Sequence, residues 1–263
     1  MPKTKTNPQI LNCEISYTKC FARAVETADF IRFRDDLLTD MYDHNSTWLI
    51  NSSSDNNLLQ NIETEITLRK TEEANFCKIV SFVPISNYVL QNLTVKPQIT
   101  TTGFYVLDAN KLPNLNNKKP CSIIKASNRQ MLADILPLEL ADCAENDEYI
   151  GFCTRKSKRR GAVYLAAEGV NLYIGYDNGE AVGNCELFID NQGIAKIEDF
   201  SVASAKQRQG YGSAILKYII DTALNSGAST IYLVTNEDDT AKEMYLKFGF
   251  TKIGEATELF FKL

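Results

Sequence analysis

The apolar positions in the second half of the chain follow two periods in turn. Apolar residues recur at every second position where a half-buried strand is expected, and at every third or fourth position where an amphipathic helix is expected. The pattern predicts strands at residues 122–125, 172–176, 181–189, 194–202 and 230–234, and a closing pair of strands at 250–253 and 258–263. It predicts helices through residues 131–136, 214–223 and 241–248. The expected order is strand, helices, three-stranded meander, helix, strand, helix and hairpin.

The first half of the chain shows a weaker pattern of the same kind. Strands are predicted at residues 30–33, 76–83 and 101–107, and a helix is predicted to carry Leu58, Leu59, Ile62 and Ile66. We interpret Trp48, the single tryptophan, as a core residue. Residues 108–120 are rich in Asn, Lys and Pro and lack apolar periodicity, which is typical of a linker. The sequence therefore predicts two domains, a smaller α/β domain at 1–119 and a second domain at 120–263.

Glycine is distributed unevenly between these halves. Of 13 glycines, only Gly103 lies in residues 1–150, and the other twelve lie in the last 113 residues. Glycine lets the backbone turn tightly or approach a ligand closely. A ligand held by backbone contacts is therefore expected in the second half, and none in the first.

Composition removes several classes of protein. There is no run of about 18 apolar residues and no apolar signal segment near the start, so we expect no membrane span and a cytoplasmic location. The seven cysteines form no C-x-x-C motif, and His44 is the only histidine, so a metal site and a Ser-His-Asp triad are not expected. The net charge of −5 argues against nucleic-acid binding.

The strongest chemical signal is the segment from Gln207 to Gly212, which joins a predicted strand to the start of a helix. The first amides of a helix have no internal partner, and the helix dipole favours an anion there. A Walker loop would need a Gly-Lys-Ser/Thr sequence, which is missing, and a dinucleotide fingerprint would need a third glycine where Ile215 stands. A pyrophosphate loop of the acyl-CoA type and a plain tight turn both remain.

Residues 122–263 resemble the GNAT N-acetyltransferase superfamily. Gln207-x-x-Gly210-x-Gly212 matches its pyrophosphate signature, and Ala241-x-x-x-Tyr245-x-x-x-Gly249-Phe250 matches its downstream motif. The strand that ends at Val202 contains Glu198-Asp199, as in the diamine and polyamine acetyltransferases. The chain departs from the family at Ser204, where a proline is common, and at Asp238, where an asparagine is usual. The resemblance implies an α/β fold with a mixed, mostly antiparallel sheet, preceded here by the smaller α/β domain, which could be a degenerate copy of it.

The resemblance also implies a set of contacts to acetyl-CoA. The strands that end at Val202 and Val234 would splay apart, and main-chain groups near Phe200 and Val202 would bind pantetheine. The amides of Gln209, Gly210, Gly212 and Ser213 would hold the pyrophosphate, and Arg208 would add charge or simply face solvent. The full set of expected cofactor contacts is Phe200, Ser201, Val202, Gln207, Arg208, Gln209, Gly210, Tyr211, Gly212, Ser213, Asn236 and Asp238.

Two residues are candidates for the proton transfers of amine acetylation. Tyr245 holds the family position for the group that protonates the leaving thiolate, and a phenol with a pKa of ~10 is protonated at neutral pH. The alternative is that Tyr245 only packs. Glu198 is the candidate base, and strand alternation predicts that it shares a face with Lys196, Phe200 and Val202 while Asp199 faces the other way. The alternative for Glu198 is a salt bridge with Lys196.

Two charge runs lie between the first predicted helix and the meander. The acidic run is Glu139, Asp142, Glu145, Asp147 and Glu148, and it is either a solvated helix end or a device that steers a cationic amine. The basic run is Arg155, Lys156, Lys158, Arg159 and Arg160, and we interpret it as a solvated face that pairs with the acidic run.

These observations predict an N-acetyltransferase that moves an acetyl group from acetyl-CoA to a primary amine of a small molecule or peptide by direct transfer. The expected protein uses no metal and is a monomer or homodimer, and its first domain covers a sheet edge or walls the acceptor cleft. The alternative is a non-catalytic acyl-CoA-binding sensor or regulatory protein.

Overall fold

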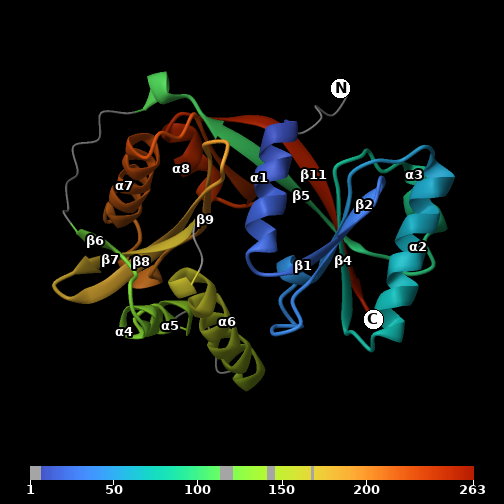
Figure 1. Cartoon of the computed structure of the whole chain (residues 1–263), viewed down its shortest axis with the longest axis horizontal. Helices are drawn as coiled ribbons and strands as arrows, with labels where there is room; N and C mark the ends of the chain where they lie inside the picture. The colour runs from blue at the N-terminus through green and yellow to red at the C-terminus, as the bar shows by residue number, and fades with distance from the viewer. Residues whose placement is uncertain (1–6, 113–120, 141–145, 167–168) are drawn as a thin grey trace.

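The computed structural model of the chain describes residues 7–112, 121–140, 146–166 and 169–263. The first half contains α1 (Pro8–Lys19), β1 (Arg23–Glu26), β2 (Phe30–Arg34), the 3₁₀ helix η1 (Asp43–Asn45), β3 (Ser46–Leu49), α2 (Asp55–Thr71), β4 (Phe76–Ser81), α3 (Asn87–Asn92), β5 (Gln98–Leu107) and η2 (Ala109–Lys111). Figure 1 shows this half on one side of the molecule, with α1 close to the centre.

The second half begins with β6 (Ser122–Lys125), α4 (Arg129–Ala133), α5 (Leu136–Leu140) and α6 (Asp147–Ala166). It continues with β7 (Val170–Asp177), β8 (Glu180–Ile189), β9 (Ile194–Val202), η3 (Ser204–Lys206), α7 (Tyr211–Asn225), β10 (Thr230–Asn236), α8 (Ala241–Lys247) and β11 (Phe250–Lys262). The predicted linker at 108–120 lies mostly outside the described residues.

One sheet of 11 strands joins both halves within the described residues, in the order β1-β2-β3-β4-β11-β5-β10-β9-β8-β7-β6. Eight of its neighbouring pairs are antiparallel, and the two parallel pairs are β3 with β4 and β9 with β10. The predicted mixed, mostly antiparallel α/β fold is confirmed.

The same element order occurs twice along the chain. In the first half three antiparallel strands, β1 to β3, are followed by α2, the parallel strand β4, the short helix α3 and β5. In the second half β7 to β9 are followed by α7, the parallel strand β10, α8 and β11. The first half therefore has the topology of the second, although its sequence lacks the glycine-rich segment.

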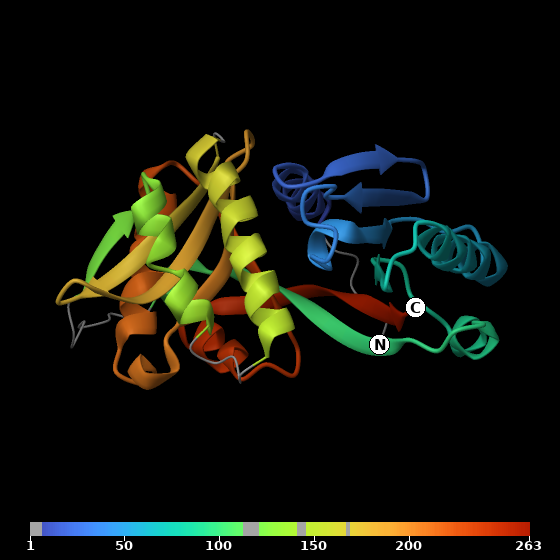
Figure 2. The ribbon, with the colours of Figure 1, turned by 90° about the horizontal axis from the view of Figure 1, so that it is seen from below.

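The last strand of each half is exchanged into the other. β5 lies between β10 and β11, so it pairs with a strand of the second half, and β11 pairs with β4 of the first half along Thr257–Lys262. Figure 2 shows β5 and β11 running from one half into the other. The boundary at residue 119/120 stays a prediction, and the sheet crosses it.

The expected hairpin at residues 250–263 is wrong. β11 is one extended strand that pairs with β5 through residues 254–257, where a turn was expected, and its register shift lies earlier, between Lys252 and Gly254. Because β5 pairs with it on one edge and β4 joins the other edge from Thr257 onward, the segment stays extended through this irregularity.

Three clusters of buried residues fill the space around the sheet. One contains α2, α3 and the end of β11, and another contains α7, α8 and strands of the second half. The third is shared by the two halves, because it holds Cys13 and Tyr17 of α1 together with Leu172, Phe188 and Ile194. Trp48 is 6% exposed within this shared cluster, which confirms its interpretation as a core residue.

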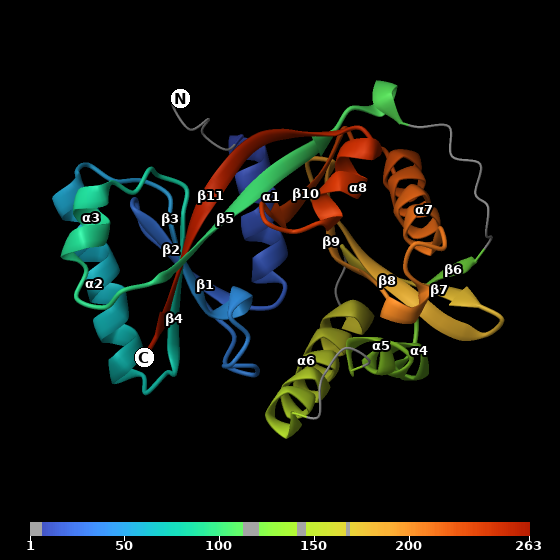
Figure 3. The same cartoon turned by 180° about the vertical axis from the view of Figure 1, so that it is seen from behind.

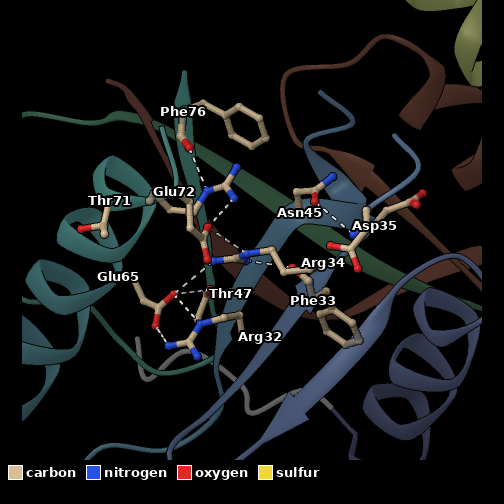
Figure 4. Close-up of polar contacts among 12 residues, drawn as sticks. Arg32, Phe33, Arg34, Asp35, Asn45, Thr47, Glu65, Thr71, Glu72 and Phe76 are labelled. Carbon is tan, nitrogen blue, oxygen red and sulfur yellow. Dashed lines mark hydrogen bonds and ion pairs between the residues drawn. The ribbon is translucent and has the colours of Figure 1, made fainter. Parts of the chain in front are cut away.

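Ion pairs fasten α2 to the sheet of the first half (Figure 4). Glu65, buried on α2, accepts from Arg32 Nε at 3.0 Å and from Thr47 Oγ1 at 2.8 Å. Further along the chain, Glu72 accepts from Arg69 at 2.8 Å and from Arg34 at 3.3 Å. This polar cluster holds a helix to its strands.

Candidate active site

The two central strands of the second half separate at their carboxyl ends. Parallel pairing between β9 and β10 runs from Ile194 and Thr230 to Ile197 and Leu233 and stops there. Beyond that point β9 pairs with β8, and β10 pairs with β5. Residues 198–202 and 234–236 therefore leave backbone edges that face each other unpaired, as the resemblance implied. Figure 3 shows β9, β10 and α8 close together in the second half.

The glycine loop lies at the end of β9, where sequence analysis placed it. Arg208 and Gly210 have φ values of +57° and +95°, so two of its residues adopt the left-handed region. Gly210 is the N-cap of α7 and provides no side-chain cap, and Ala214 is the first residue to donate back, to Gly210 O at 3.0 Å. The amides of Gly212 and Ser213 precede this first donor. Such an uncapped helix start with left-handed turns is suited to an anion.

The corresponding helix of the first half, α2, has a capped and negatively charged start, which does not favour an anion. The N-cap Ser54 accepts from the Asn57 amide at 3.2 Å, and Asp55 places a negative charge in the first turn. β3 also stays paired with β4 along its whole length. The first half therefore has neither an open helix start nor a splayed pair of strands.

Several residues that were expected to contact the cofactor use their side chains for hydrogen bonds within the protein. Tyr211 is 1% exposed and donates to Asp177, so only its main chain can reach a ligand. Gln207 donates to Val202 O at 3.1 Å and Gln209 donates to Ala205 O at 2.9 Å, so these amides brace the loop itself. Ser201 Oγ donates to Asn184 at 2.7 Å. Apart from Arg208, these side chains already have partners within the protein, so the main chain of the loop is the group left to bind a ligand.

The remaining expected contacts lie around the separated strand ends. Asn236 Oδ1 accepts from the Asp238 amide at 2.9 Å in an exposed turn after β10. Phe200 and Val202 lie against Gly212, each at 3.4 Å from where a Cβ on that glycine would stand. The Arg208 side chain is exposed. Each of these cofactor contacts stays a prediction.

The strand containing Glu198 is irregular, and this changes which residues share a face. Asp199 has φ +43°, and the register with β8 shifts between Asn184 and Glu186. Asn184 Nδ2 donates to Asp199 O at 2.7 Å and supports the bulge. Because of this extra residue Glu198 and Asp199 line the same cavity, while Phe200 packs towards α8. The alternation expected for this strand is therefore wrong at Asp199.

Glu198 forms the salt bridge that sequence analysis gave as its alternative role. Its Oε2 is 2.8 Å from Lys196 Nζ, and its side chain is 33% exposed. Lys196 is 5% exposed and also contacts both oxygens of Glu14, each at 2.7 Å. Burial raises the pKa of Glu14, and the Lys196 ammonium opposes that shift. Lys196 therefore pairs both with Glu14, on α1 of the first half, and with the candidate base Glu198.

A second buried network lies beside this one. Glu186 is fully buried and accepts from Tyr17 at 2.6 Å, from Tyr164 and from Arg160. Arg160 also contacts Asp199 Oδ2 at 2.7 Å. Its guanidinium holds the pKa of Asp199 below the usual value, although burial acts in the other direction. These contacts fix the orientation of the bulge that carries Glu198 and Asp199.

Tyr245 is 8% exposed and packs from α8 against Phe200 and Phe250, at ring distances of 6.4 and 6.1 Å. Burial raises its pKa, and the nearby charge of Glu198 raises it further. The phenol is therefore protonated throughout the neutral range. The packing role is present, and the role as proton donor stays a prediction.

A cavity of about 340 Å³ opens next to the separated strands. Its walls include Glu198 and Asp199 of β9 and residues 234–236 of β10, which are the segments that do not pair with each other. The opposite walls come from the first half, from α1, β3, β4 and β5. The candidate site therefore lies between the two halves.

Only Arg155 and Lys158 of the basic run are exposed, so the interpretation of a solvated face is wrong for the other three residues. Arg159 donates to Asp35 at 3.0 Å, Arg155 contacts Asp40, and Arg160 is buried. Among the described residues, only Lys156 pairs with the acidic run, at Glu139. Helix α6 packs beside the first half, whose carboxylates replace solvent as partners. Asp142 and Glu145 of the acidic run lie outside the described residues.

Helix α1, which supplies Glu14 and Tyr17 to these networks, is not among the elements that the sequence pattern predicts. Asn7 caps the helix by accepting from Gln9 N at 2.9 Å, and Pro8 occupies its first position. Ile10, Cys13 and Tyr17 are its buried apolar residues. An Asn-Pro start followed by this spacing is a helix signal that could have been recognised.

Comparison with known proteins agrees with the geometry. Residues 143–250 match the model of the acetyltransferase (GNAT) family. A protein named uncharacterized N-acetyltransferase CgeE, from Bacillus subtilis, is 36% identical over 109 residues, which are 40% of this chain and 42% of that protein. The match thus spans less than half the length of this relative.

Two solved structures have a similar fold over nearly the whole chain. A functionally unknown conserved protein from Staphylococcus epidermidis is 20% identical with a TM-score of 0.73, covering 92% of this chain and 94% of the other. A GCN5-related N-acetyltransferase from Kribbella flavida is 13% identical with a TM-score of 0.69, covering 96% and 94%. The resemblance inferred from the glycine loop is confirmed.

Membrane spans and metal clusters are both missing from the described residues. Their helices are all too short or too polar to cross a bilayer. Within the same residues, no group of three or more His, Cys, Asp or Glu side chains is arranged to hold a metal ion. The fold, the glycine loop and the downstream motif all agree with the match of residues 143–250 to the model of the acetyltransferase (GNAT) family.

Proposed function

We propose that this protein transfers an acetyl group from acetyl-CoA to a primary amine of a small molecule, by direct transfer in the cavity between its halves. One observation carries the proposal. The strands β9 and β10 stop pairing at Ile197 and Leu233, with the uncapped start of α7 on one side of the gap and the cavity on the other.

The residues around the gap fit acetyl-CoA. The unpaired edges at 198–202 and 234–236 can bond to the amide groups of pantetheine as a strand would. The amides of Gly212 and Ser213 can hold the pyrophosphate, and a Cβ at Gly210 would project into open space. Acetyl-CoA supplies the acetyl group as a thioester.

The chain's own residues would manage the protons. Glu198 presents a carboxylate to the cavity, with Oε2 held by Lys196, and can take a proton from the acceptor ammonium directly or through water. Tyr245 keeps a proton on Oη at neutral pH and can donate it to a thiolate. Glu14, Lys196 and Arg160 act as positioning residues, because Lys196 contacts Glu198, Glu14 holds that lysine, and Arg160 contacts Asp199.

The first half would contribute walls to the acceptor cavity and no cofactor site. Its copy of the fold has a capped helix start with Asp55 in the first turn, and its parallel strands do not separate. We therefore expect one acetyl-CoA bound per chain.

The test is thiol release from acetyl-CoA with a panel of primary amines, beside calorimetry with acetyl-CoA alone. Tyr245→Phe and Glu198→Gln should each lower kcat about 100-fold, the low end for loss of a general acid or base, with little change in acetyl-CoA affinity. The exposed positions Tyr88→Phe and Glu26→Gln are matched controls. Acetyl-CoA binding without thiol release for any amine would support the sensor alternative.

A further inference from the structure

The cavity between the halves has one aromatic side. Trp48 from β3, Phe82 after β4 and Phe104 from β5 line it, and we call these three residues the aromatic wall. Their rings follow one another, with centroids 5.6 Å apart for Trp48 and Phe82 and 5.9 Å apart for Phe82 and Phe104. Val80, Val234 and Ala256 fill the surface around them. All three rings belong to the first half, and Phe82 is the partly exposed one.

The rest of the cavity lining carries paired charges. Five carboxylates line it, Glu14, Asp43, Glu198, Asp199 and Glu258, against four cations, Lys78, Lys156, Arg160 and Lys196. Burial lowers the pKa of His44, which also lines the cavity, so its imidazole is neutral at pH 7. The lining therefore has an excess of one negative charge, which one ammonium group would balance.

The position for that ammonium follows from the contacts of the carboxylates. Both oxygens of Glu14 contact Lys196, and Glu258 uses one oxygen for Lys78 and the other for Thr102 Oγ1 at 3.0 Å. Asp199 uses one oxygen for Arg160 and the other for Lys156. Among the described residues no partner is seen for Glu198 Oε1 or for Asp43 Oδ2, whose carboxylates use their other oxygens for Lys196 and Lys78. Glu198 also lies on the strand that borders the gap. An amine bonded to Oε1 would lie beside the proposed acetyl donor.

The size of the cavity limits the occupant. At about 340 Å³ it is near the lower end of the ~300–1,000 Å³ usual for small-molecule sites. It suits a compact molecule with one amine and excludes a folded peptide segment.

We propose that the acceptor is a small arylalkylamine with a single positive charge, whose ring lies on the aromatic wall and whose amine lies at Glu198. This inference rests on the proposed function. It assigns to the first half the recognition of the aromatic ring of the acceptor. The aromatic wall would bind this ring by burying its apolar surface and by ring–ring contacts. A carboxylate on the acceptor would add a second negative charge to a lining that already has an excess of one.

Turnover by the full chain tests the substrate class, with saturating acetyl-CoA and four amines. We expect kcat/KM for 2-phenylethylamine to exceed that for n-butylamine at least ~10-fold, because even a single methylene in an apolar pocket discriminates by that factor. Phenylalanine, which adds a carboxylate, and 1,4-diaminobutane, which adds a second charge, should both be poorer than 2-phenylethylamine by a similar factor. Equal kcat/KM for the four amines would overturn the inference and leave the proposed function standing.

Variants of the wall separate recognition from folding. Phe82→Ala should lower kcat/KM for 2-phenylethylamine about tenfold and change that for n-butylamine by less than about threefold. Phe260→Ala, an equal truncation in β11 outside this cavity, should change neither value. A uniform loss for all amines in Phe82→Ala would show that the wall only supports the fold, which contradicts the inference.

Binding can be followed without turnover, because Trp48 is the only tryptophan and lies in the wall. Titration with 2-phenylethylamine, without acetyl-CoA, should change its emission to saturation, and the Phe82→Ala variant should need about tenfold more amine, the same factor as in turnover. Emission that does not respond would overturn the inference. Thiol release that fails with every amine while emission still saturates would instead overturn the proposed function, and support acceptor binding at the wall.

Discussion

The bond between Glu14 and Lys196 ties the first half to the candidate base, and its strength can be predicted. Lys196 is 5% exposed and lies between two carboxylates, at 2.7 Å from Glu14 and 2.8 Å from Glu198. Removing one partner of a buried ion pair costs ~3–5 kcal/mol when it leaves the other charge alone. In Glu14→Gln the lysine keeps Glu198 and gains an amide oxygen, so we expect a smaller loss, about 2–3 kcal/mol of unfolding free energy.

A double-mutant cycle isolates this contact. Lys196→Met leaves the buried Glu14 without its cation and should cost about 3–5 kcal/mol. In the double variant the side chain at position 14 is an uncharged amide, so the total loss should be smaller than the sum by about 2 kcal/mol. Glu180→Gln, which breaks an exposed pair with Lys206, is the control and should change stability by less than about 1 kcal/mol.

Urea denaturation followed by Trp48 emission measures each free energy, with the slopes compared among the variants. Additive losses would refute the reasoning, because independent sites add and contacting sites do not. An unchanged midpoint in Glu14→Gln would refute it as well.

Three further predictions follow from the fold and the loop. Gly210→Ala should lose about 1–2 kcal/mol of stability, because residue 210 has a left-handed backbone, and it should also bind acetyl-CoA more weakly in calorimetry. The control is Gly179→Ala, which has φ +83° and equally open space around the added Cβ. It should show the loss of stability alone. Burial holds the pKa of His44 below the ~6.5 of an unfolded chain, so below pH ~6.5 the folded state binds fewer protons than the unfolded state and loses stability as the pH falls. The free energy of unfolding, measured by urea titration, should therefore decrease more between pH ~7.5 and ~5.5 in the wild type than in His44→Asn. Equal decreases in the two proteins would contradict this. A fragment of residues 120–263 should fail to fold cooperatively by circular dichroism, because β11 pairs only with β4 and β5 among the described strands, and a sharp transition in the fragment would disprove that dependence.

Local patterns were sufficient for most elements of the second half. The hairpin signal at Asp177–Gly179, the β-branched strand at 230–234 and the glycine-flanked helix at 214–223 correspond to β7–β8, β10 and α7. Each depends on neighbours a few residues away, which a periodic pattern contains. The position of the glycine loop at the start of α7 was predictable for the same reason.

Patterns that depend on distant partners were interpreted wrongly. The segment at 254–257 has the pattern of a turn, but pairing with β5 holds it extended, and β4 joins at Thr257. Strand alternation put Asp199 opposite Glu198, but a bulge supported by Asn184 brings both to one cavity. The basic run looked solvated, but Asp35 and Asp40 come to it from more than a hundred residues away. In each case the deciding contact is absent from the local sequence.

The sequence by itself determined the chemistry of one place, the glycine loop, because an uncapped helix start needs only the few residues that form it. It also determined that the first half has no such loop. The tertiary structure alone decided that the halves exchange their last strands and that α1, α6 and the aromatic wall meet around Glu198. The physical reason is that buried charges and apolar surfaces are satisfied by whatever lies nearest in space, and the sheet brings those partners together from both ends of the chain.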